Sequence, residues 1–190
     1  MGLTFANKIT IVRIVAVPFF IATLLYYSPE RDHLRYVALG IFLFAVISDV
    51  IDGYIARTRN QKTVAGAILD PLADKLLLIS AFVCLSMIGV YFDPALRLPV
   101  WLVVAVISRD VILLLGSMII HLVQGKLIID PTRWGKATTF FQVFCIIGIL
   151  LQWPFSPVIW YVTVVLTAIS GFDYIYDGIK TLNANSAHHS

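Results

Sequence analysis

Six long apolar segments, separated by short polar connections, occupy most of this sequence. They run over residues 7–27, 36–57, 66–91, 98–123, 137–153 and 157–177. A helix needs about 20 mainly apolar residues to cross the hydrocarbon core of a bilayer. The composition agrees, because 59% of the residues are hydrophobic and only 13% are charged, against about 25% charged in soluble domains. The segments therefore predict an all-α membrane bundle of six transmembrane helices.

The spans leave no room for a separate soluble domain. We expect a single membrane domain over residues 1–190, with a flexible polar tail at 181–190. The net charge of +3 is too small to indicate a nucleic-acid partner. Cys84 and Cys145 lie in apolar runs without metal-ligand spacing, so we interpret them as packing residues.

Four aspartates interrupt the apolar pattern of the second and third segments: Asp49, Asp52, Asp70 and Asp74. A carboxylate in a hydrocarbon layer costs about 2.5 kcal/mol or more, so such residues usually mark a site. At about 100° per residue, the two aspartates of each segment share one face of their helix. Because the connection is short, the helices should be antiparallel neighbours. This predicts two facing pairs at matching depths, Asp52 with Asp70 and Asp49 with Asp74.

A cage of carboxylates of this kind suits divalent cations. Mg²⁺ takes oxygen ligands and often shares its site with substrate phosphates, and two metals form the usual clamp for displacement at phosphorus. Gly53, Ala56 and Gly66 accompany the aspartates, and their small size would let a phosphate approach the helices. The alternative is that the small residues only allow close helix packing, while the carboxylates line a channel or a cation-transport path.

The aspartates belong to a longer spaced pattern, Asp49-x-x-Asp52-Gly53-x-x-Ala56-Arg57, then eight residues, then Gly66-x-x-x-Asp70-x-x-x-Asp74. This pattern resembles the signature of the CDP-alcohol phosphatidyltransferases, and every defined position is met. The motif covers residues 49–74, and the six-helix layout extends the resemblance over most of the chain.

The resemblance implies transfer of a phosphatidyl group from CDP-diacylglycerol to an alcohol, with release of CMP. It implies two Mg²⁺ or Mn²⁺ ions held by Asp49, Asp52 and Asp70. Asp74 would touch the second metal and take the proton from the acceptor hydroxyl as general base. The pocket for the cytidine diphosphate is implied at Asp49, Asp52, Gly53, Ala56, Arg57 and Gly66. A homodimer is implied as well.

Two acceptors are open, and both carry a phosphate. The run Gly135-Lys136-x-Thr138 resembles family members that use glycerol 3-phosphate, which we favour. Those members usually carry a further arginine where this chain has Gly116-Ser117-Met118. The run Ser108-Arg109-Asp110-Val111 resembles members that use phosphatidylglycerol to make cardiolipin.

Five polar or basic residues are predicted to hold the acceptor's phosphate. Arg109 lies in the middle of the fourth segment, and the others lie near segment ends: Lys136, Arg133, Thr10 and Arg13. Arginine offers phosphate a planar fork, and lysine a movable point charge. Three of these residues also have a simpler interpretation. Arg109 and Asp110 would neutralise each other in the bundle, Lys136 would face lipid head groups, and Arg13 would extend to them from a polar helix start.

The basic loop residues indicate the orientation. One side holds Lys8, Arg57, Arg59, Lys62, Lys126, Arg133, Lys136 and Lys180, and the other only Arg31, Arg35 and Arg97. The positive-inside rule then places both termini and a polar cavity with the aspartates at the cytoplasmic face of the inner membrane. A transporter or channel would need polar residues across the whole bilayer, whereas residues 39–47 and 79–83 are almost wholly apolar.

Overall fold

The computed structural model of this chain is built from α-helices. It describes the backbone of residues 5–59, 64–124 and 133–186, and the side chains of residues 10–51, 72–116 and 134–174. That part of the chain contains no strand. Its helices are α1 (Phe5–Leu25), α2 (His33–Arg59), α3 (Val64–Ile88), α4 (Val100–Gln124), α5 (Arg133–Leu150) and α6 (Ser156–Ser186). Each overlaps one of the six apolar segments, so the all-α expectation is confirmed.

Four helices are long and apolar enough to cross a bilayer. Within the described residues the qualifying stretches are His33–Ile51, Leu72–Tyr91, Pro94–Gly116 and Ser156–Tyr174. The apolar stretches of α1 and α5, Thr10–Leu25 and Trp134–Leu150, are shorter. The chain is therefore a multi-pass membrane protein. The count of six spans, the polar cavity and the flexible tail at 181–190 stay predictions.

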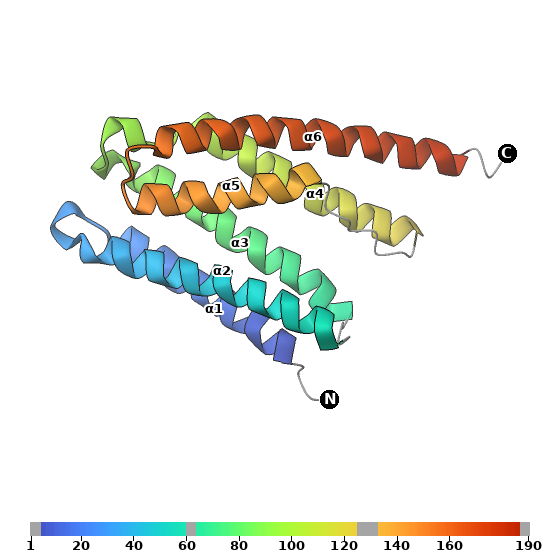
Figure 1. Cartoon of the computed structure of the whole chain (residues 1–190), viewed down its shortest axis with the longest axis horizontal. Helices are drawn as coiled ribbons and strands as arrows, with labels where there is room; N and C mark the ends of the chain where they lie inside the picture. The colour runs from blue at the N-terminus through green and yellow to red at the C-terminus, as the bar shows by residue number, and fades with distance from the viewer. Residues whose placement is uncertain (1–4, 60–63, 125–132, 187–190) are drawn as a thin grey trace. The chain divides into compact units, whose positions relative to one another are not determined.

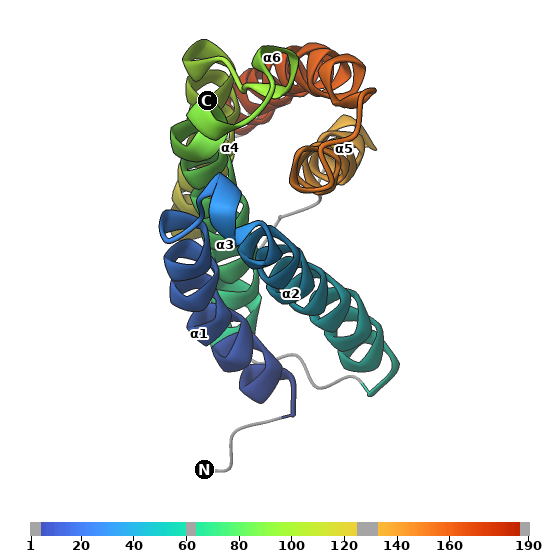
Figure 2. The same ribbon diagram turned by 90° about the vertical axis from the view of Figure 1, so that its left-hand side faces the viewer.

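The chain divides into two compact units, of which the first comprises Met1–Pro99 and Ile146–Pro154. Here α1 packs against both α2 and α3, and α2 runs opposite in direction to the other two (Figures 1 and 2). The rings of Phe20 on α1 and Phe42 on α2 lie 5.8 Å apart, and both side chains are fully buried. The buried faces that meet are Phe20 and Leu24 of α1, Ala38, Phe42 and Ala45 of α2, and Ala73, Leu77 and Ala81 of α3. Alanines about two helical turns apart, Ala38 with Ala45 and Ala73 with Ala81, let these helices approach closely.

Arg35, in the first turn of α2, connects the start of α2 to the end of α5 within this unit. It is 5% exposed, and its Nε and Nη2 each lie 2.8 Å from an oxygen of Asp32. Its Nη1 donates to the carbonyl oxygen of Leu150, the last residue of α5, at 2.7 Å. The final carbonyls of a helix lack partners within the helix, so Arg35 satisfies one of them and ties α5's end to α2.

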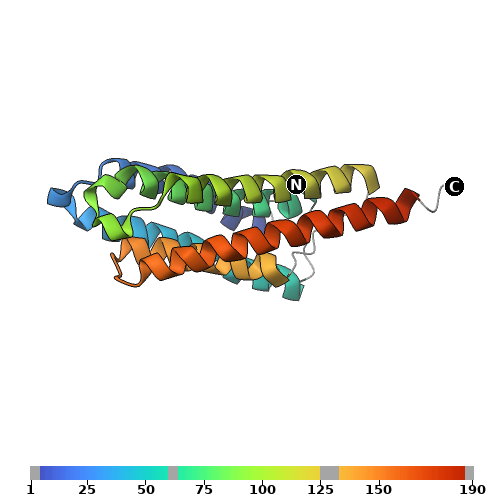
Figure 3. The ribbon, with the colours of Figure 1, turned by 90° about the horizontal axis from the view of Figure 1, so that it is seen from above.

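The second unit comprises Val100–Cys145 and Phe155–Ser190. In it α4 packs against α6, and the two helices run in the same direction (Figure 3). Trp101 of α4 meets Trp160 of α6 edge-on, with ring centroids 6.4 Å apart. This unit therefore has its own packed seam.

Two threonines link α5 to α6 within the second unit. The hydroxyl of Thr138 donates to the carbonyl oxygen of Leu166 at 3.1 Å, and that of Thr163 to the carbonyl oxygen of Phe141 at 3.3 Å. Hydroxyl-to-carbonyl bonds of this kind help to hold neighbouring helices together in a bilayer, where burial of apolar surface provides little driving force.

Candidate functional site

Arg13 of α1 is the centre of a charged cluster in the first unit. Its Nη2 lies 2.6 Å from Oδ1 of Asp49 on α2, and its Nη1 lies 2.5 Å from Oδ1 of Asp74 on α3. The arginine is only 1% exposed, whereas the side chains of the two aspartates are 38% and 36% exposed. One buried cation thus joins three helices, and the cluster is accessible from its carboxylate side.

The apolar faces of the three helices explain why these groups meet. Asp49 follows the buried Ala45 by four residues, so it continues the packed face of α2. On α3, Asp74 precedes the buried Leu78 by four residues. On α1, Arg13 lies two helical turns before the buried Phe20. Packing of the apolar faces therefore brings one cation and two anions together at the end of the same seam.

The outer two aspartates of the motif converge, but through a third helix. The chain runs in opposite directions in α2 and α3, as the spacing predicted (Figure 1). Asp49 and Asp74 meet on the guanidinium of Arg13, because α1 packs against both of their helices. From the sequence, Arg13 was predicted to help bind the acceptor's phosphate, and this bridge between Asp49 and Asp74 was not predicted.

The other motif residues lie on the same two helices, but their side chains fall outside the described part of the chain. Helix α2 carries Asp52, Gly53, Ala56 and Arg57, and helix α3 carries Gly66 and Asp70. Among the side chains that are described, no three aspartate, glutamate, histidine or cysteine residues gather as metal ligands. Those side chains include only two of the four motif aspartates, so the predicted cage stays a prediction.

The two motif aspartates whose side chains are described suit a hard divalent cation. Asp49 and Asp74 come from different helices, and both bring carboxylate oxygens to one positive charge. Carboxylate oxygens are the ligands that Mg²⁺ and Mn²⁺ prefer. The donor set therefore fits such an ion, with Arg13 as the cation that balances the carboxylates in this structure.

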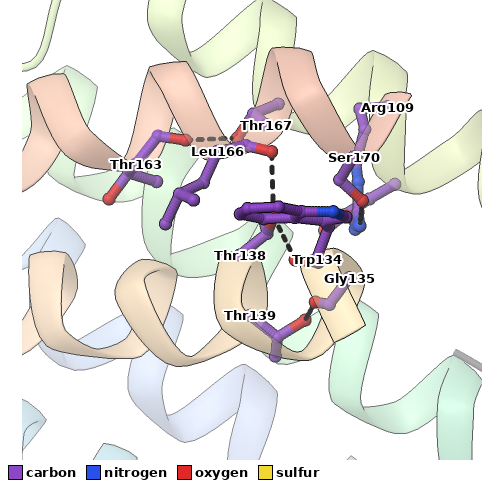
Figure 4. A network of polar contacts seen from close by, with 10 residues as sticks. Arg109, Trp134, Gly135, Thr138, Thr139, Thr163, Leu166, Thr167 and Ser170 are labelled. Atoms are coloured by element: carbon purple, nitrogen blue, oxygen red, sulfur yellow. Dashed lines mark hydrogen bonds and ion pairs between the residues drawn. The ribbon is translucent and has the colours of Figure 1, made fainter. Parts of the chain in front are cut away.

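Arg109 of α4 forms a second polar cluster, which lies in the second unit. Its Nη1 donates to Oδ1 of the neighbouring Asp110 at 2.7 Å, and its Nη2 donates to the hydroxyl of Ser170 on α6 (Figure 4). Arg109 is 7% exposed and Asp110 is fully buried. The two charges neutralise each other here, and the acceptor-phosphate role of Arg109 stays a prediction.

The remaining residues predicted for the acceptor are placed only in part. Lys136 is exposed in the first turn of α5, within the second unit. Thr10 is buried, three residues before Arg13 on α1, within the first unit. The side chain of Arg133, the first residue of α5, lies outside the described part. Whether these residues share a pocket stays a prediction.

The sequence analysis overlooked a polar face on α6. Thr163, Thr167 and Ser170 are all buried, and they follow one another at four and three residues (Figure 4). The hydroxyl of Thr167 donates to the carbonyl oxygen of Thr163 at 2.6 Å. That helical spacing of hydroxyl side chains was the available signal.

A cavity of about 300 Å³ also lies between α4 and α6, and apolar side chains such as Ile112 and Phe172 make up most of its lining.

Apolar helices that carry a buried arginine and two facing carboxylates define a membrane protein with a charged intramembrane site. The chain belongs to the CDP-alcohol phosphatidyltransferase family, whose model matches residues 3–169. The resemblance seen in the spaced motif is thus confirmed.

The relatives of this chain carry names from two branches of that family. A "Probable phosphatidylglycerophosphate synthase" of Mycobacterium tuberculosis is 34% identical, over 93% of this chain and 82% of the relative. The "CDP-diacylglycerol--glycerol-3-phosphate 3-phosphatidyltransferase" of Bacillus subtilis is 32% identical, over 93% of this chain and 97% of the relative. A "Cardiolipin synthase (CMP-forming)" of Homo sapiens is 30% identical, over 94% of this chain and 63% of the relative.

Proposed function

We propose that this chain transfers a phosphatidyl group from CDP-diacylglycerol to glycerol 3-phosphate, which releases CMP and yields phosphatidylglycerophosphate. The observation that carries the proposal is the meeting of Asp49 and Asp74 on one buried guanidinium, because these are the first and last aspartates of the family's motif. The names of the Mycobacterium tuberculosis and Bacillus subtilis relatives support this acceptor and product.

The motif aspartates are proposed to hold two Mg²⁺ or Mn²⁺ ions. Asp49, Asp52 and Asp70 are the ligands, and Asp74 touches the second ion. Bound there, the ions would neutralise the pyrophosphate of the donor and the charge that develops on departing CMP. The exposure of the Asp49 and Asp74 side chains supports this role, since an arriving ion can reach their oxygens.

The residues between these aspartates are proposed to line the pocket for the cytidine diphosphate, together with Asp49 and Asp52. Gly53, Ala56 and Gly66 are small, so a bulky phosphate can approach the helix backbone. Arg57 adds a planar set of donors that suits phosphate oxygens. The lipid part of the donor stays in the bilayer while its head group reaches this pocket.

Asp74 is proposed to take the proton from the attacking hydroxyl as general base. A bond forms between the acceptor oxygen and the phosphorus that carries the diacylglycerol, and the bond from that phosphorus to the CMP oxygen breaks. Asp74 lies beside Asp49 on the shared guanidinium, so the proposed base is close to a proposed metal ligand.

The phosphate of the acceptor is proposed to bind Arg109 and Lys136, with help from Arg133, Thr10 and Arg13. Lys136 is exposed, which suits contact with a soluble substrate. In this structure Nη1 and Nη2 of Arg109 contact Asp110 and Ser170, while its buried Nε has no hydrogen-bond partner among the described residues and is a donor left over for a phosphate.

A second candidate function is cardiolipin synthesis, with phosphatidylglycerol as the acceptor. The run Ser108-Arg109-Asp110-Val111 and the human relative favour it. A cation transporter or channel is the candidate from another class. The fully buried Phe20 and Phe42 in the seam of α1 and α2 favour a closed site over a path through the membrane.

We place the chain in the inner membrane as a homodimer, with both termini and the aspartates on the cytoplasmic side. The excess of basic residues in the loops on that side supports the orientation, and the family implies the dimer. Cysteine labelling from outside should modify Asp93→Cys and Phe155→Cys but not Asn60→Cys. External labelling at position 60 would overturn the orientation.

The test of the function is CMP release from CDP-diacylglycerol by the purified protein in detergent. Release should require Mg²⁺ or Mn²⁺, should stop in EDTA, and should depend on glycerol 3-phosphate within a panel of alcohols. Release with phosphatidylglycerol alone would make the chain a cardiolipin synthase. Cation flux into vesicles, with no release of CMP from CDP-diacylglycerol whichever alcohol is offered, would support the transporter.

A further inference from the structure

We propose that Arg13 is a positioning residue that competes with divalent cations for the motif carboxylates. The inference rests on the proposed function in taking Asp49 as a metal ligand with Asp74 beside it. Without metal, the guanidinium holds Asp49 and Asp74 together. When a cation binds, Arg13 gives up its contact with Asp49, so this exchange sets how tightly the metal is held.

Burial shows which partner in this cluster can be exchanged. Arg13 is 1% exposed, so its charge stays among the helices, whereas the Asp49 and Asp74 side chains are 38% and 36% exposed. A cation that approaches the cluster therefore meets carboxylate oxygens before it meets the guanidinium. Arg13 contacts Oδ1 of each carboxylate, at 2.6 Å for Asp49 and 2.5 Å for Asp74. Only the contact with Asp74 is a hydrogen bond, so the contact with Asp49 is the one that a cation exchanges more easily.

Electrostatics determines the direction of the effect. A divalent cation on Asp49 lies within a few Å of the guanidinium, and like charges at such a separation repel strongly inside a protein. Arg13 therefore weakens metal binding. In the absence of metal, the same charge relieves the repulsion between two carboxylates that lie close enough to share one guanidinium. Arg13 stabilises the metal-free protein at the expense of metal affinity.

Arg35 provides a matched control within the same unit. It is also buried, 5% exposed, and it also pairs with a partly exposed carboxylate, that of Asp32. Its pairing lies at the start of α2 and involves no motif residue. Loss of Arg35 removes a buried cation from the fold without changing the charge beside Asp49 and Asp74.

The experiment compares Arg13→Gln, Arg13→Lys, Arg35→Gln and the unmodified chain in detergent. Mn²⁺ binding is measured by the electron paramagnetic resonance signal of free Mn²⁺, and melting temperature is measured in EDTA and in saturating Mg²⁺. Arg13→Gln should bind Mn²⁺ about 10-fold tighter or more. It should melt lower in EDTA and recover most of that loss in Mg²⁺. Arg35→Gln should melt lower in both conditions and bind Mn²⁺ as the unmodified chain does.

Equal or weaker Mn²⁺ binding by Arg13→Gln would overturn the proposal, as would a loss of melting temperature that Mg²⁺ does not recover. If Arg13→Gln fails to fold, Arg13→Lys decides. The lysine ammonium keeps the positive charge but lacks the planar set of donors that contacts both carboxylates. The Arg13→Lys variant should therefore bind Mn²⁺ about 3-fold tighter than the unmodified chain, and unchanged binding would refute the exchange. CMP release by the unmodified chain is measured separately, so a failure of the proposed function remains distinct from a failure of the Arg13 inference.

Discussion

Two buried arginines, Arg13 and Arg109, both balance carboxylate charge in this chain, but their surroundings differ. Arg13 takes its partners from two other helices, and the side chains of Asp49 and Asp74 are both more than one-third exposed. Arg109 takes its carboxylate from the next residue of the same helix, and Asp110 is fully buried. The first cluster is accessible on one side. The second is enclosed by protein, except that Arg109 lines the cavity between α4 and α6.

From this difference we infer that the accessible cluster is the one suited to exchange a partner, whereas the enclosed cluster mainly supports the fold. An accessible ion pair can exchange one partner for a metal or a substrate, and the intramembrane charges then serve function. An enclosed pair contributes mainly because removing one partner leaves the other charge buried without compensation. Two of the family's motif aspartates, Asp49 and Asp74, fall in the accessible cluster, which is why we place the proposed chemistry there.

The largest effect should come from breaking the accessible cluster at Asp49. Asp49→Asn removes a carboxylate from the proposed metal site, so metal-dependent CMP release should fall to background and Mn²⁺ binding should weaken. Asp32→Asn is the control, because Asp32 also pairs with a buried arginine but lies outside the motif. An Asp49→Asn protein that turned over normally would remove Asp49 from the metal site.

Asp74→Asn should separate proton transfer from metal binding within the same cluster. The neutral amide cannot accept the hydroxyl proton, so the rate should fall by about 10²-fold or more, the range of general-base catalysis. Binding of CDP-diacylglycerol, measured by displacement of a labelled donor, should stay largely intact. Near-normal turnover would show that another group acts as the base.

Arg109→Gln tests whether the enclosed cluster has only a structural role. The variant removes the cation that Asp110 contacts, so unfolding should become easier by about 3–5 kcal/mol. The double variant Arg109→Gln with Asp110→Asn should recover most of that stability, measured by denaturation in detergent. If Arg109 also binds the acceptor, the double variant should keep a raised KM for glycerol 3-phosphate with an unchanged KM for CDP-diacylglycerol. An unchanged KM for both substrates would leave Arg109 with a structural role alone.

The smallest effect concerns Asp32, whose pairing with Arg35 lies outside both clusters. Hydrogen bonds from Arg35 lower the pKa of Asp32 from its ordinary value. A lowered pKa means that the carboxylate stabilises the fold above about pH 4, and that this contribution is lost as the pH falls further. Because the side chain of Asp32 is partly exposed, at 46%, we expect less than about 1 kcal/mol. Melting temperatures of Asp32→Asn and the unmodified chain should differ slightly at pH 7, and the difference should shrink as the pH is lowered below about 4. A gap that widened in acid would contradict this assignment.

The sequence predicted the helices well because their signal is local. Each apolar segment carries its own length and hydropathy, and the six described helices overlap all six segments. Four of them are long enough to span a bilayer, while the described apolar parts of α1 and α5 fall short of that length. The helix ends lie one to four residues from the predicted segment ends, except at the end of α6. That helix continues to Ser186, nine residues past the segment, because polar residues also continue a helix and hydropathy does not register them.

The sequence predicted the site only as far as helical periodicity reaches. The spacing of Asp49 and Asp74 correctly indicated two carboxylates directed to one place from antiparallel helices. The role of Arg13 was missed, because a lone arginine near a helix start has several simpler explanations. The polar face of Thr163, Thr167 and Ser170 was missed because hydroxyl side chains hardly change the hydropathy of a span.

The sequence by itself determined the helical membrane class, the family and the helix faces that carry the aspartates, since these follow from hydropathy, motif spacing and the period of the helix. Only the tertiary structure decided which cation lies between Asp49 and Asp74. Arg13 and Asp74 are 61 residues apart, and contacts across that separation depend on how helices pack and rotate about their axes. The pairing of Arg109 with Asp110 was likewise decided there, because neighbours on a helix point about 100° apart, and the packing of α6 against α4 brings Ser170 onto that arginine and helps to hold the pair.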